Sequence, residues 1–141
     1  MTIRIRTFDR ADETDVIALW QRCGLTRPWN DPQRDIARKL SEQPELFLVG
    51  TVEDRLIASA MIGFDGHRGW VYYLAVAPDC QRRGYGKRLM AEAERRLSEV
   101  GCPKLMLMVR TENTTVIDFY RHLGYDINAT AVLGKRLISD E

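Results

Sequence analysis

The sequence predicts one α/β domain (1–141), a mixed, mostly antiparallel sheet of about six to seven strands flanked by about four helices. Two observations lead to this prediction. Strand-like and amphipathic helical patterns alternate along the chain in the order β-α-α-β-β-β-α-β-α-β-β. In addition, 141 residues with 45% hydrophobic content match the size and composition of one globular domain, and no repeat, low-complexity segment or linker divides them.

The first third of the chain predicts one strand and two helices. Residues 3–8 alternate as a half-buried strand does. Apolar residues then recur at helical spacing: Val16, Leu19, Trp20 and Cys23. Gly24 is placed to end that helix, and Asp31–Pro32 is typical of an N-cap followed by the first position of a second, shorter helix through Leu40.

Three strands follow. Residues 46–52 and 56–63 predict an antiparallel pair joined by a tight turn at residues 53–55. Residues 65–69 form a second hairpin loop, which leads into a buried strand over residues 70–76. The middle of the chain is therefore expected to fold as a meander.

The last third predicts a helix between strands. A strong amphipathic helix, with apolar positions from Leu89 to Val100, precedes a strand over residues 104–109 that is expected to be buried on both faces. A further helix is expected from an N-cap at Asn113 to a stop at Gly124. Residues 125–127 and 131–138 are expected to form closing strands.

Charge and composition narrow the class of protein. The formal net charge of +1 gives no general attraction to nucleic acid or membranes, and no apolar run approaches the length of a membrane span. The N-terminus lacks the apolar core of a signal peptide. The odd number and wide spacing of the cysteines, and the isolation of the two histidines, argue against disulfides and metal sites. We expect a cytoplasmic protein without a metal.

The strand that ends at Val76 and the helix that carries Leu89 are joined by a short basic loop with two glycines. Glycines allow backbone N–H groups to converge on one point, and a helix N-terminus adds partial positive charge. The third glycine of a dinucleotide fingerprint is absent, because Leu89 occupies its position, and the spacing of a Walker A loop is absent too. The loop therefore predicts a phosphate or pyrophosphate site formed by Gln81, Arg82, Arg83, Gly84, Tyr85, Gly86 and Lys87.

The stretch Gln81-Arg-Arg-Gly-Tyr-Gly86 resembles the acetyl-CoA loop of the GCN5-related N-acetyltransferase (GNAT) superfamily, written Q/R-x-x-G-x-G/A. A second stretch, with Asn113, Phe119-Tyr120 and Gly124-Tyr125, resembles the superfamily's N-x-x-A-x-x-F-Y-x-x-x-G-F helix. The order of elements matches the GNAT fold over essentially the whole chain. The Arg-Pro-Trp-Asn-Asp-Pro and Asp-Gly-His-Arg-Gly segments also look like those of the YpeA-type acetyltransferases.

The resemblance implies an acetyl-CoA-dependent N-acetyltransferase that moves an acetyl group to a primary amine by direct attack, through a tetrahedral intermediate. It implies a GNAT fold with a splayed central pair of strands. The cofactor's pantetheine arm would pair with backbone groups of Leu74, Ala75 and Val76, and its pyrophosphate would lie on the basic loop. Asn113 would contact the cofactor, and Tyr120 would give a proton to the departing thiolate.

The proton acceptor is where the sequence departs from the better-known patterns. Trp70 and Met108 occupy the positions where histone-type and N-terminal-amine (RimI-type) relatives place a glutamate. Open candidates are Asp31, Asp65, His67, Tyr72 or Tyr73 through water, or no dedicated base. Two loops are expected to form the acceptor site, with candidate residues Arg27, Trp29, Asn30, Asp31, Asp65 and His67.

Two other functional classes stay open on the sequence. One is a catalytically silent GNAT-fold module that binds CoA or acyl-CoA, which the two missing glutamates favour. The other is a nucleotide-phosphate binder of unrelated fold, which would bind ATP or NAD and ignore CoA. A homodimer is also possible, and the sequence does not name the acceptor.

Overall fold

The computed structural model describes residues 2–141. Its contacts divide the chain into two compact units. The first runs to Leu107 and also includes Asp140–Glu141, and the second is Met108–Ser139. The single domain predicted over residues 1–141 stays a prediction.

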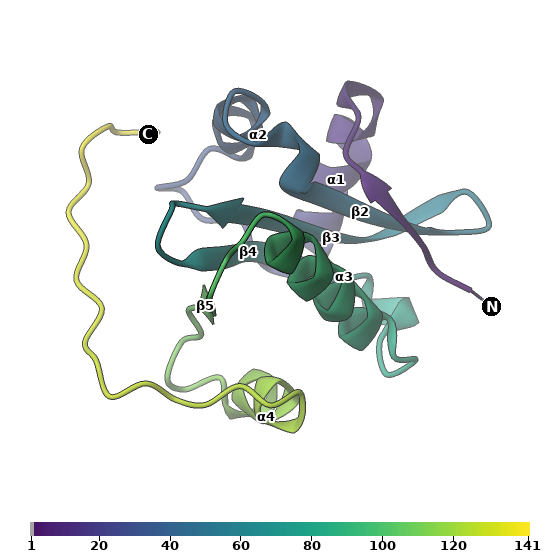
Figure 1. The fold of residues 1–141 in the computed structure, drawn as a ribbon. Coiled ribbons are helices and arrows are strands. Elements are labelled where there is room, and N and C mark those ends of the chain that lie inside the picture. Colours follow the sequence, from purple (N-terminus) through teal and green to yellow (C-terminus); the bar gives the residue numbers. More distant parts are fainter. Residues whose placement is uncertain (1) are drawn as a thin grey trace. The chain divides into compact units, whose positions relative to one another are not determined.

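The first unit holds most of the regular structure (Figure 1). Its strands are β1 (Arg4–Thr7), β2 (Phe47–Val52), β3 (Arg55–Phe64), β4 (Gly69–Val76) and β5 (Leu105–Leu107). Its helices are α1 (Glu13–Arg22), α2 (Pro32–Leu40) and α3 (Tyr85–Glu99), with short 3-10 helices η1 (Arg10–Asp12), η2 (Pro44–Leu46) and η3 (Pro78–Cys80). The predicted α/β class is confirmed.

The helix ends follow the local signals in the sequence. Asp31 caps α2, because its Oδ1 accepts hydrogen bonds from the N–H groups of Gln33 at 2.9 Å and Arg34 at 3.3 Å. Pro32 takes the first helical position, where a missing N–H costs nothing. Gly24 follows α1 with a φ of 69°, a left-handed conformation that suits glycine at a helix end.

The sheet of the first unit has five strands in the order β1-β2-β3-β4-β5. The first four strands pair antiparallel with their neighbours, while β4 and β5 pair in parallel. The expectation of six to seven strands is therefore wrong for the structure, although the mixed, mostly antiparallel character holds. The parallel ladder covers only three pairs and ends at Val71–Leu107, whereas β4 continues to Val76.

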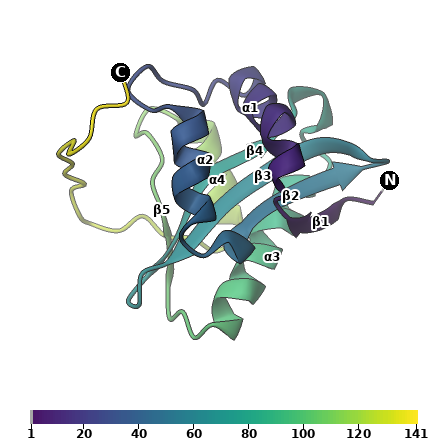
Figure 2. The ribbon, with the colours of Figure 1, turned by 90° about the horizontal axis from the view of Figure 1, so that it is seen from above.

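Helices lie on both faces of this sheet. Figures 1 and 2 show α1 and α2 over one face and α3 over the other. On the α1 side, Trp20 stacks with Phe47 of β2 and donates to Ser59 of β3. The α3 side buries the helix residues Leu89, Met90, Ala93 and Leu97. Consecutive residues are buried in the middle strands, Phe47–Val49 in β2 and Ile57–Ile62 in β3. Because successive strand residues point to opposite faces, both faces of these two strands are covered.

One glycine is required by close packing. At Gly69, where β4 begins, an added Cβ would lie 2.8 Å from the Cys102 sulfur and 2.9 Å from a methyl group of Leu97. The start of β4 thus lies against the C-terminal end of α3 with no room for a side chain.

The second unit contains α4 (Thr114–His122) and an irregular segment that follows it. The closing strands predicted at residues 125–127 and 131–138 are wrong for this structure, because those residues pair with no strand among residues 2–141. Leu133 and Leu137 are 89% and 87% exposed. Apolar residues alone do not make a strand, because the backbone polar groups of a strand need a neighbouring strand, and none of the described strands pairs with this segment.

The strand predicted over residues 104–109 is also corrected. It shortens to β5, whose three residues are half-buried, and Met108 beyond it is 51% exposed. The physical reason is its place in the sheet, since β5 is an edge strand with β4 as its one partner among the described strands. Within residues 2–141, no helix has both the length and the apolar character needed to cross a membrane.

Candidate active site

The basic loop lies between the end of β4 and the start of α3. Gly84 is the N-cap of α3 in a left-handed conformation, with a φ of 81°, and Arg82 has a φ of 64°. The first intrahelical bond shown runs from the N–H of Arg88 to the carbonyl of Gly84 at 3.1 Å, and no side chain caps the helix. The N–H groups of the first turn therefore point out of the helix end, where the macrodipole favours an anion.

The side chains of the basic loop differ in how far they are buried. Tyr85 is 7% exposed and anchors the start of α3 in the core, while Arg82, Arg83 and Lys87 are exposed. Three flexible cations thus surround a backbone held in place. This combination suits a diphosphate, since amides fix its oxygens and the cations neutralise its charge.

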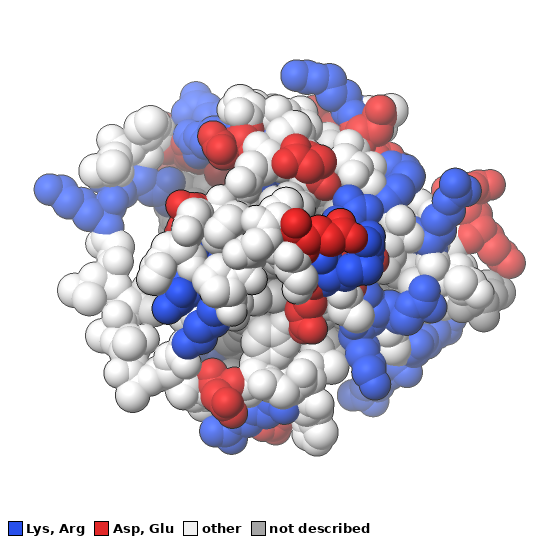
Figure 3. Space-filling view, viewed as in Figure 1, with Lys and Arg blue, Asp and Glu red and all other residues white. Residues whose placement is uncertain are grey.

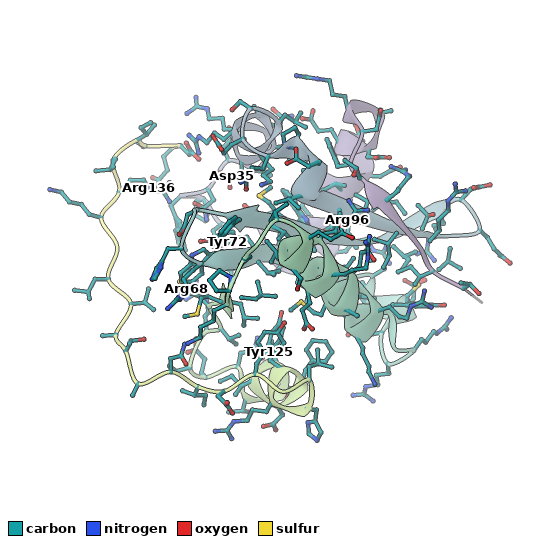
Figure 4. All side chains as sticks on the ribbon, in the orientation of Figure 1. Asp35, Arg68, Tyr72, Arg96, Tyr125 and Arg136 are labelled. Carbon is teal, nitrogen blue, oxygen red and sulfur yellow. The ribbon has the colours of Figure 1, made fainter. Side chains whose placement is uncertain are left out.

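Elsewhere on the surface, positive and negative side chains are mixed. On the face drawn in Figure 3, Lys and Arg side chains lie beside Asp and Glu side chains. Along α3, Glu92 pairs with Arg95 and Arg96, and Glu99 pairs with Arg95. Figure 4 labels Arg96 on this helix. Such pairing leaves no single-sign field on α3 beyond the loop.

The entrance to the loop is held by an ion-pair cluster on Asp79 of η3. Arg55, at the start of β3, contacts both carboxylate oxygens at 2.9 and 3.2 Å, and Arg22, at the end of α1, contacts one at 3.0 Å. The hydrogen bonds from Arg55 are the main reason that the pKa of Asp79 lies well below its usual range. The cluster ties the residues just before the loop to two other elements.

The backbone of Val76 faces the open edge of β4. The N–H of Ala77 bonds to the carbonyl of Ile57 at 2.7 Å, and in an antiparallel ladder the neighbouring residue turns its polar groups the other way. The Val76 carbonyl accordingly accepts the Gln81 side-chain amide at 3.0 Å and the Cys23 thiol at 3.3 Å. Gln81, predicted to bind cofactor, thus holds the loop against β4, while the Val76 N–H faces outward.

A β-bulge lies three residues before Val76. Between the pairs Met61–Tyr72 and Ser59–Ala75, two residues of β4, Tyr73 and Leu74, oppose one residue of β3. Tyr73 has a φ of 53°, a left-handed conformation that is costly for a side chain of its size. Bulges of this kind re-aim side chains and end strand pairing, and this one begins two residues after the last pair of β4 with β5, Val71–Leu107.

Three contacts hold Tyr73 in this conformation. Its ring stacks on Trp20 at a centroid distance of 3.8 Å, and its carbonyl accepts the Ser59 hydroxyl at 2.8 Å. Its own hydroxyl donates to Asp35 Oδ2 of α2 at 2.7 Å. Burial, and then the hydrogen bond to Asp35, raise the pKa of Tyr73 well above its ordinary value. Figure 4 shows Asp35 and Tyr72, from α2 and β4, on the same side of the first unit.

In the first predicted acceptor loop, two of the predicted residues, Arg27 and Asp31, stabilise local structure. Residues 27–30 form a turn in which Arg27 and Asn30 pair and Trp29 is 43% exposed. The Arg27 guanidinium donates to the carbonyls of Gly24 at 2.7 Å and Thr26 at 2.9 Å, so it stabilises its own loop. Asp31 is the α2 cap described above. Trp29 lies at the tip of this turn, and its acceptor-binding role stays a prediction.

In the second predicted acceptor loop, the Asp65 side chain stabilises the turn by binding backbone N–H groups. Asp65 Oδ1 accepts the N–H groups of Arg68 at 2.7 Å and His67 at 2.8 Å. These bonds, that from Arg68 first, lower the pKa of Asp65 and make it a poorer proton acceptor. His67 is exposed at the loop tip.

The structure does not bring the two predicted acceptor loops together. Asp31, in the first loop, is the N-cap of α2. Gln43 lies just beyond the other end of α2, and its side-chain amide donates to the Phe64 carbonyl and accepts the Phe64 N–H, both at 2.9 Å, beside the second loop. The two loops are therefore separated by about the length of the nine-residue helix α2, roughly 14 Å at about 1.5 Å per residue.

Asn113 and Tyr120 lie in the second unit, and their roles remain predictions from the motif. Asn113 stands at the N-cap of α4 but makes no side-chain capping bond, contrary to the expectation that it caps the helix. Tyr120 is 8% exposed, and its ring meets Phe119 and Tyr125 edge-on at 5.0 and 5.8 Å. Burial raises the pKa of Tyr120 to about 12, which keeps its hydroxyl protonated at neutral pH.

The basic loop and the second motif both fall within the match to a known protein family. The model of the acetyltransferase (GNAT) family matches residues 8–125. The chain belongs to this family. It is an acyltransferase that uses acetyl-CoA as its donor.

Whole-length relatives agree with the assignment. The chain is 50% identical over 139 residues to an acetyltransferase of Yersinia enterocolitica, covering 99% of both chains. It is 49% identical over 140 residues to an acetyltransferase of Sodalis glossinidius, again covering 99% of both.

Solved structures support the fold. Ard1 from Thermoplasma volcanium has a TM-score of 0.82 at 28% identity, covering 92% of this chain and 86% of that one. The AAC(6')-Iy enzyme, solved with a CoA-containing bisubstrate analogue, has a TM-score of 0.82 at 15% identity, covering 98% and 100%. At that identity the second likeness concerns the fold alone.

Proposed function

We propose that this chain transfers the acetyl group of acetyl-CoA to a primary amine of a small molecule or protein, by direct attack of the amine on the thioester. The observation that carries the proposal is the arrangement at the end of β4. There, an uncapped helix start ringed by Arg82, Arg83 and Lys87 lies next to an outward-facing backbone at Val76.

The first unit supplies the features that hold the donor. The N–H groups at the start of α3 and the three cations would bind the pyrophosphate. The pantetheine arm is an amide-containing chain, and it would pair with the exposed edge of β4 from Leu74 to Val76, as a peptide strand does. The Val76 N–H would then stabilise the negative oxygen of the tetrahedral intermediate.

Tyr73 and Asp35 form our candidate for the proton acceptor. Asp31 and Asp65 are engaged in backbone caps, and the usual glutamate positions are occupied by Trp70 and Met108. The acceptor ammonium would give its proton to Tyr73 Oη while the Tyr73 hydroxyl proton passes to Asp35, 2.7 Å away. The raised pKa of Tyr73 favours such a relay over a stable tyrosinate.

Tyr120 is our candidate for the acid. Collapse of the intermediate breaks the carbon–sulfur bond, and the departing thiolate takes the Tyr120 hydroxyl proton. Asn113, which does not cap its helix, would contact the cofactor. Since all three cysteines of the chain are free, we also propose a cytoplasmic setting.

Turnover tests the proposal directly. Release of free CoA thiol from acetyl-CoA would be followed with spermidine, lysine amide and a peptide with a free N-terminus as acceptors. We expect at least one amine to be acetylated. Tyr120→Phe should lower kcat by about 10²-fold or more and leave the Kd for acetyl-CoA unchanged. Tyr125→Phe, the same change on the neighbouring ring, is the control and should retain activity. Full kcat in Tyr120→Phe would remove the acid role.

A further inference from the structure

The end of the chain is bound to α2. Asp140–Glu141 belong to the first unit, and both Figure 1 and Figure 2 show the C-terminus beside α2. The side chain of Asp140 has 0% of its surface exposed. It accepts hydrogen bonds from the Asp31 N–H at 3.0 Å and from both Arg38 Nη atoms at 2.7 and 3.1 Å. Arg34 lies 3.7 Å away.

Arg38 connects this buried carboxylate to the candidate proton relay. Its Nη1 lies 3.1 Å from Asp140 Oδ2 and also 3.1 Å from Asp35 Oδ1. The other oxygen of Asp35 accepts the Tyr73 hydroxyl at 2.7 Å. A continuous series of charge-assisted bonds therefore runs from the last residues of the chain to the bulge in β4.

Asp140 is the part of this series that fixes Arg38. An exposed Asp–Arg pair three residues apart on a helix is weak and does not hold a guanidinium in one place. The Arg38 side chain is 44% exposed, so its own helix leaves it free to move. A two-pronged contact with a buried carboxylate does fix it, because the planar fork matches the carboxylate geometry.

We propose that Asp140 is a positioning residue for acetyl transfer: through Arg38 it fixes the Asp35 carboxylate, and through Asp35 it orients the Tyr73 hydroxyl. The proposal rests on the proposed function, in which Tyr73 receives the acceptor's proton. Asp140 itself touches no reacting atom. Without it, Arg38 swings into solvent, Asp35 loses one of its two partners, and the Tyr73 hydroxyl is no longer held in one direction.

The first test needs no acceptor. The chain has five tyrosines, so Cζ labelling with ¹³C gives few resonances, and the one lost in Tyr73→Phe identifies Tyr73. Asp140→Asn should move the Tyr73 resonance. Asp126→Asn, which removes the same charge from an exposed residue after α4, should leave it in place. A Tyr73 resonance that Asp140→Asn does not move would overturn the proposal, whatever the enzyme acetylates.

The second test separates positioning from simple loss of stability. In the wild-type background, Asp140→Asn should lower kcat about tenfold with an unchanged KM for acetyl-CoA. In a Tyr73→Phe background, Asp140→Asn should change kcat little, because the group on which it acts is gone. Equal losses in both backgrounds would show that Asp140 acts elsewhere and would contradict the proposal.

A second variant guards against a folding artefact. Arg38→Lys keeps the charge but loses the fork, so it should move the Tyr73 resonance and lower kcat as Asp140→Asn does. If it does neither, the route through Arg38 is wrong. A wild-type enzyme that acetylates no amine would count against the proposed function alone, since the resonance test still decides the role of Asp140.

Discussion

At the scale of single residues, the least ordinary feature is the backbone of Tyr73. A non-glycine residue with a φ of 53° carries a conformational cost, of order 1–3 kcal/mol, that its surroundings must offset. Trp20 stacks on the ring, Asp35 binds the hydroxyl and Ser59 binds the carbonyl. We interpret the strain as the means by which β4 turns its next residues, up to Val76, toward an open edge.

Ser59 tests this interpretation. Its hydroxyl accepts the Trp20 N–H at 2.9 Å and donates to the Tyr73 carbonyl at 2.8 Å, and its side chain is fully buried. Ser59→Ala leaves both partners unsatisfied, so urea denaturation should show a loss of about 1–3 kcal/mol in the free energy of unfolding. Ser98→Ala, on the exposed face of α3, is the matched control. A Ser59→Ala midpoint equal to that of Ser98→Ala would mean that the bulge does not depend on this hydroxyl.

Single residues of the sequence indicate some of the roles seen in the structure and not others. The Asp31–Pro32 pair predicts the cap of α2, and the sequence predicts a hairpin loop at residues 65–69; the structure shows the cap, and it shows Asp65 bonded to the backbone of that loop. Asp35 was missed as a functional candidate. The spacing of Asp35 and Arg38, three residues apart on a predicted helix, does indicate an ion pair between them. The hydrogen bond from Tyr73 to Asp35 could not be predicted, because nothing in the local sequence indicates which strand residue faces α2.

At the scale of elements, α3 combines the proposed donor site at its start with a charged outer face. Glu92 pairs with both Arg95 and Arg96, and those bonds, that from Arg95 first, lower its pKa to about 2 from an ordinary 4.5. A carboxyl group whose pKa falls on folding stabilises the native state above its ordinary pKa. That stabilisation is lost as the pH falls through the folded value.

Glu92→Gln should therefore cost stability at neutral pH and nothing at very low pH. We expect a loss of about 1 kcal/mol or less at pH 7, since the pairs are near the surface. The difference from wild type should shrink between pH 4.5 and pH 2. Thermal melts at several pH values measure this. Glu99→Gln, which pairs with Arg95 alone and is 63% exposed, is the control with a smaller effect. A difference that stays constant down to pH 2 would contradict the assignment.

Elements with local signals were predicted best. The helices, the two hairpins and the strand–loop–helix unit around Gly84 all have caps, turn residues or periodicity in the sequence itself. The prediction of closing strands is wrong because short apolar runs favour a strand without supplying its partner. Residues 131–138 contain two short apolar runs, but the structure gives them no ladder.

At the scale of the whole molecule, the account depends on contacts between distant parts of the first unit. The pairing of Arg38 with Asp140 joins residues 102 positions apart, and no pattern in the sequence points to it. The basic loop, in contrast, is visible in the sequence alone and lies within the residues that the family model matches, and its cofactor-binding role stays a prediction. Whether the chain forms a homodimer stays a prediction, and its oligomeric state can be measured separately.

The central claim is that the start of α3 binds the pyrophosphate of acetyl-CoA, and calorimetric titration tests it most directly. Acetyl-CoA should bind the wild-type protein in the micromolar range, CoA should also bind, and ATP should not compete. Combining Arg82→Ala, Arg83→Ala and Lys87→Ala should weaken binding by at least about tenfold. Combining Arg4→Ala, Arg10→Ala and Lys104→Ala, which removes equal charge from exposed positions elsewhere, should not. Absence of any CoA binding, or equal affinity in the two triple variants, would contradict the account.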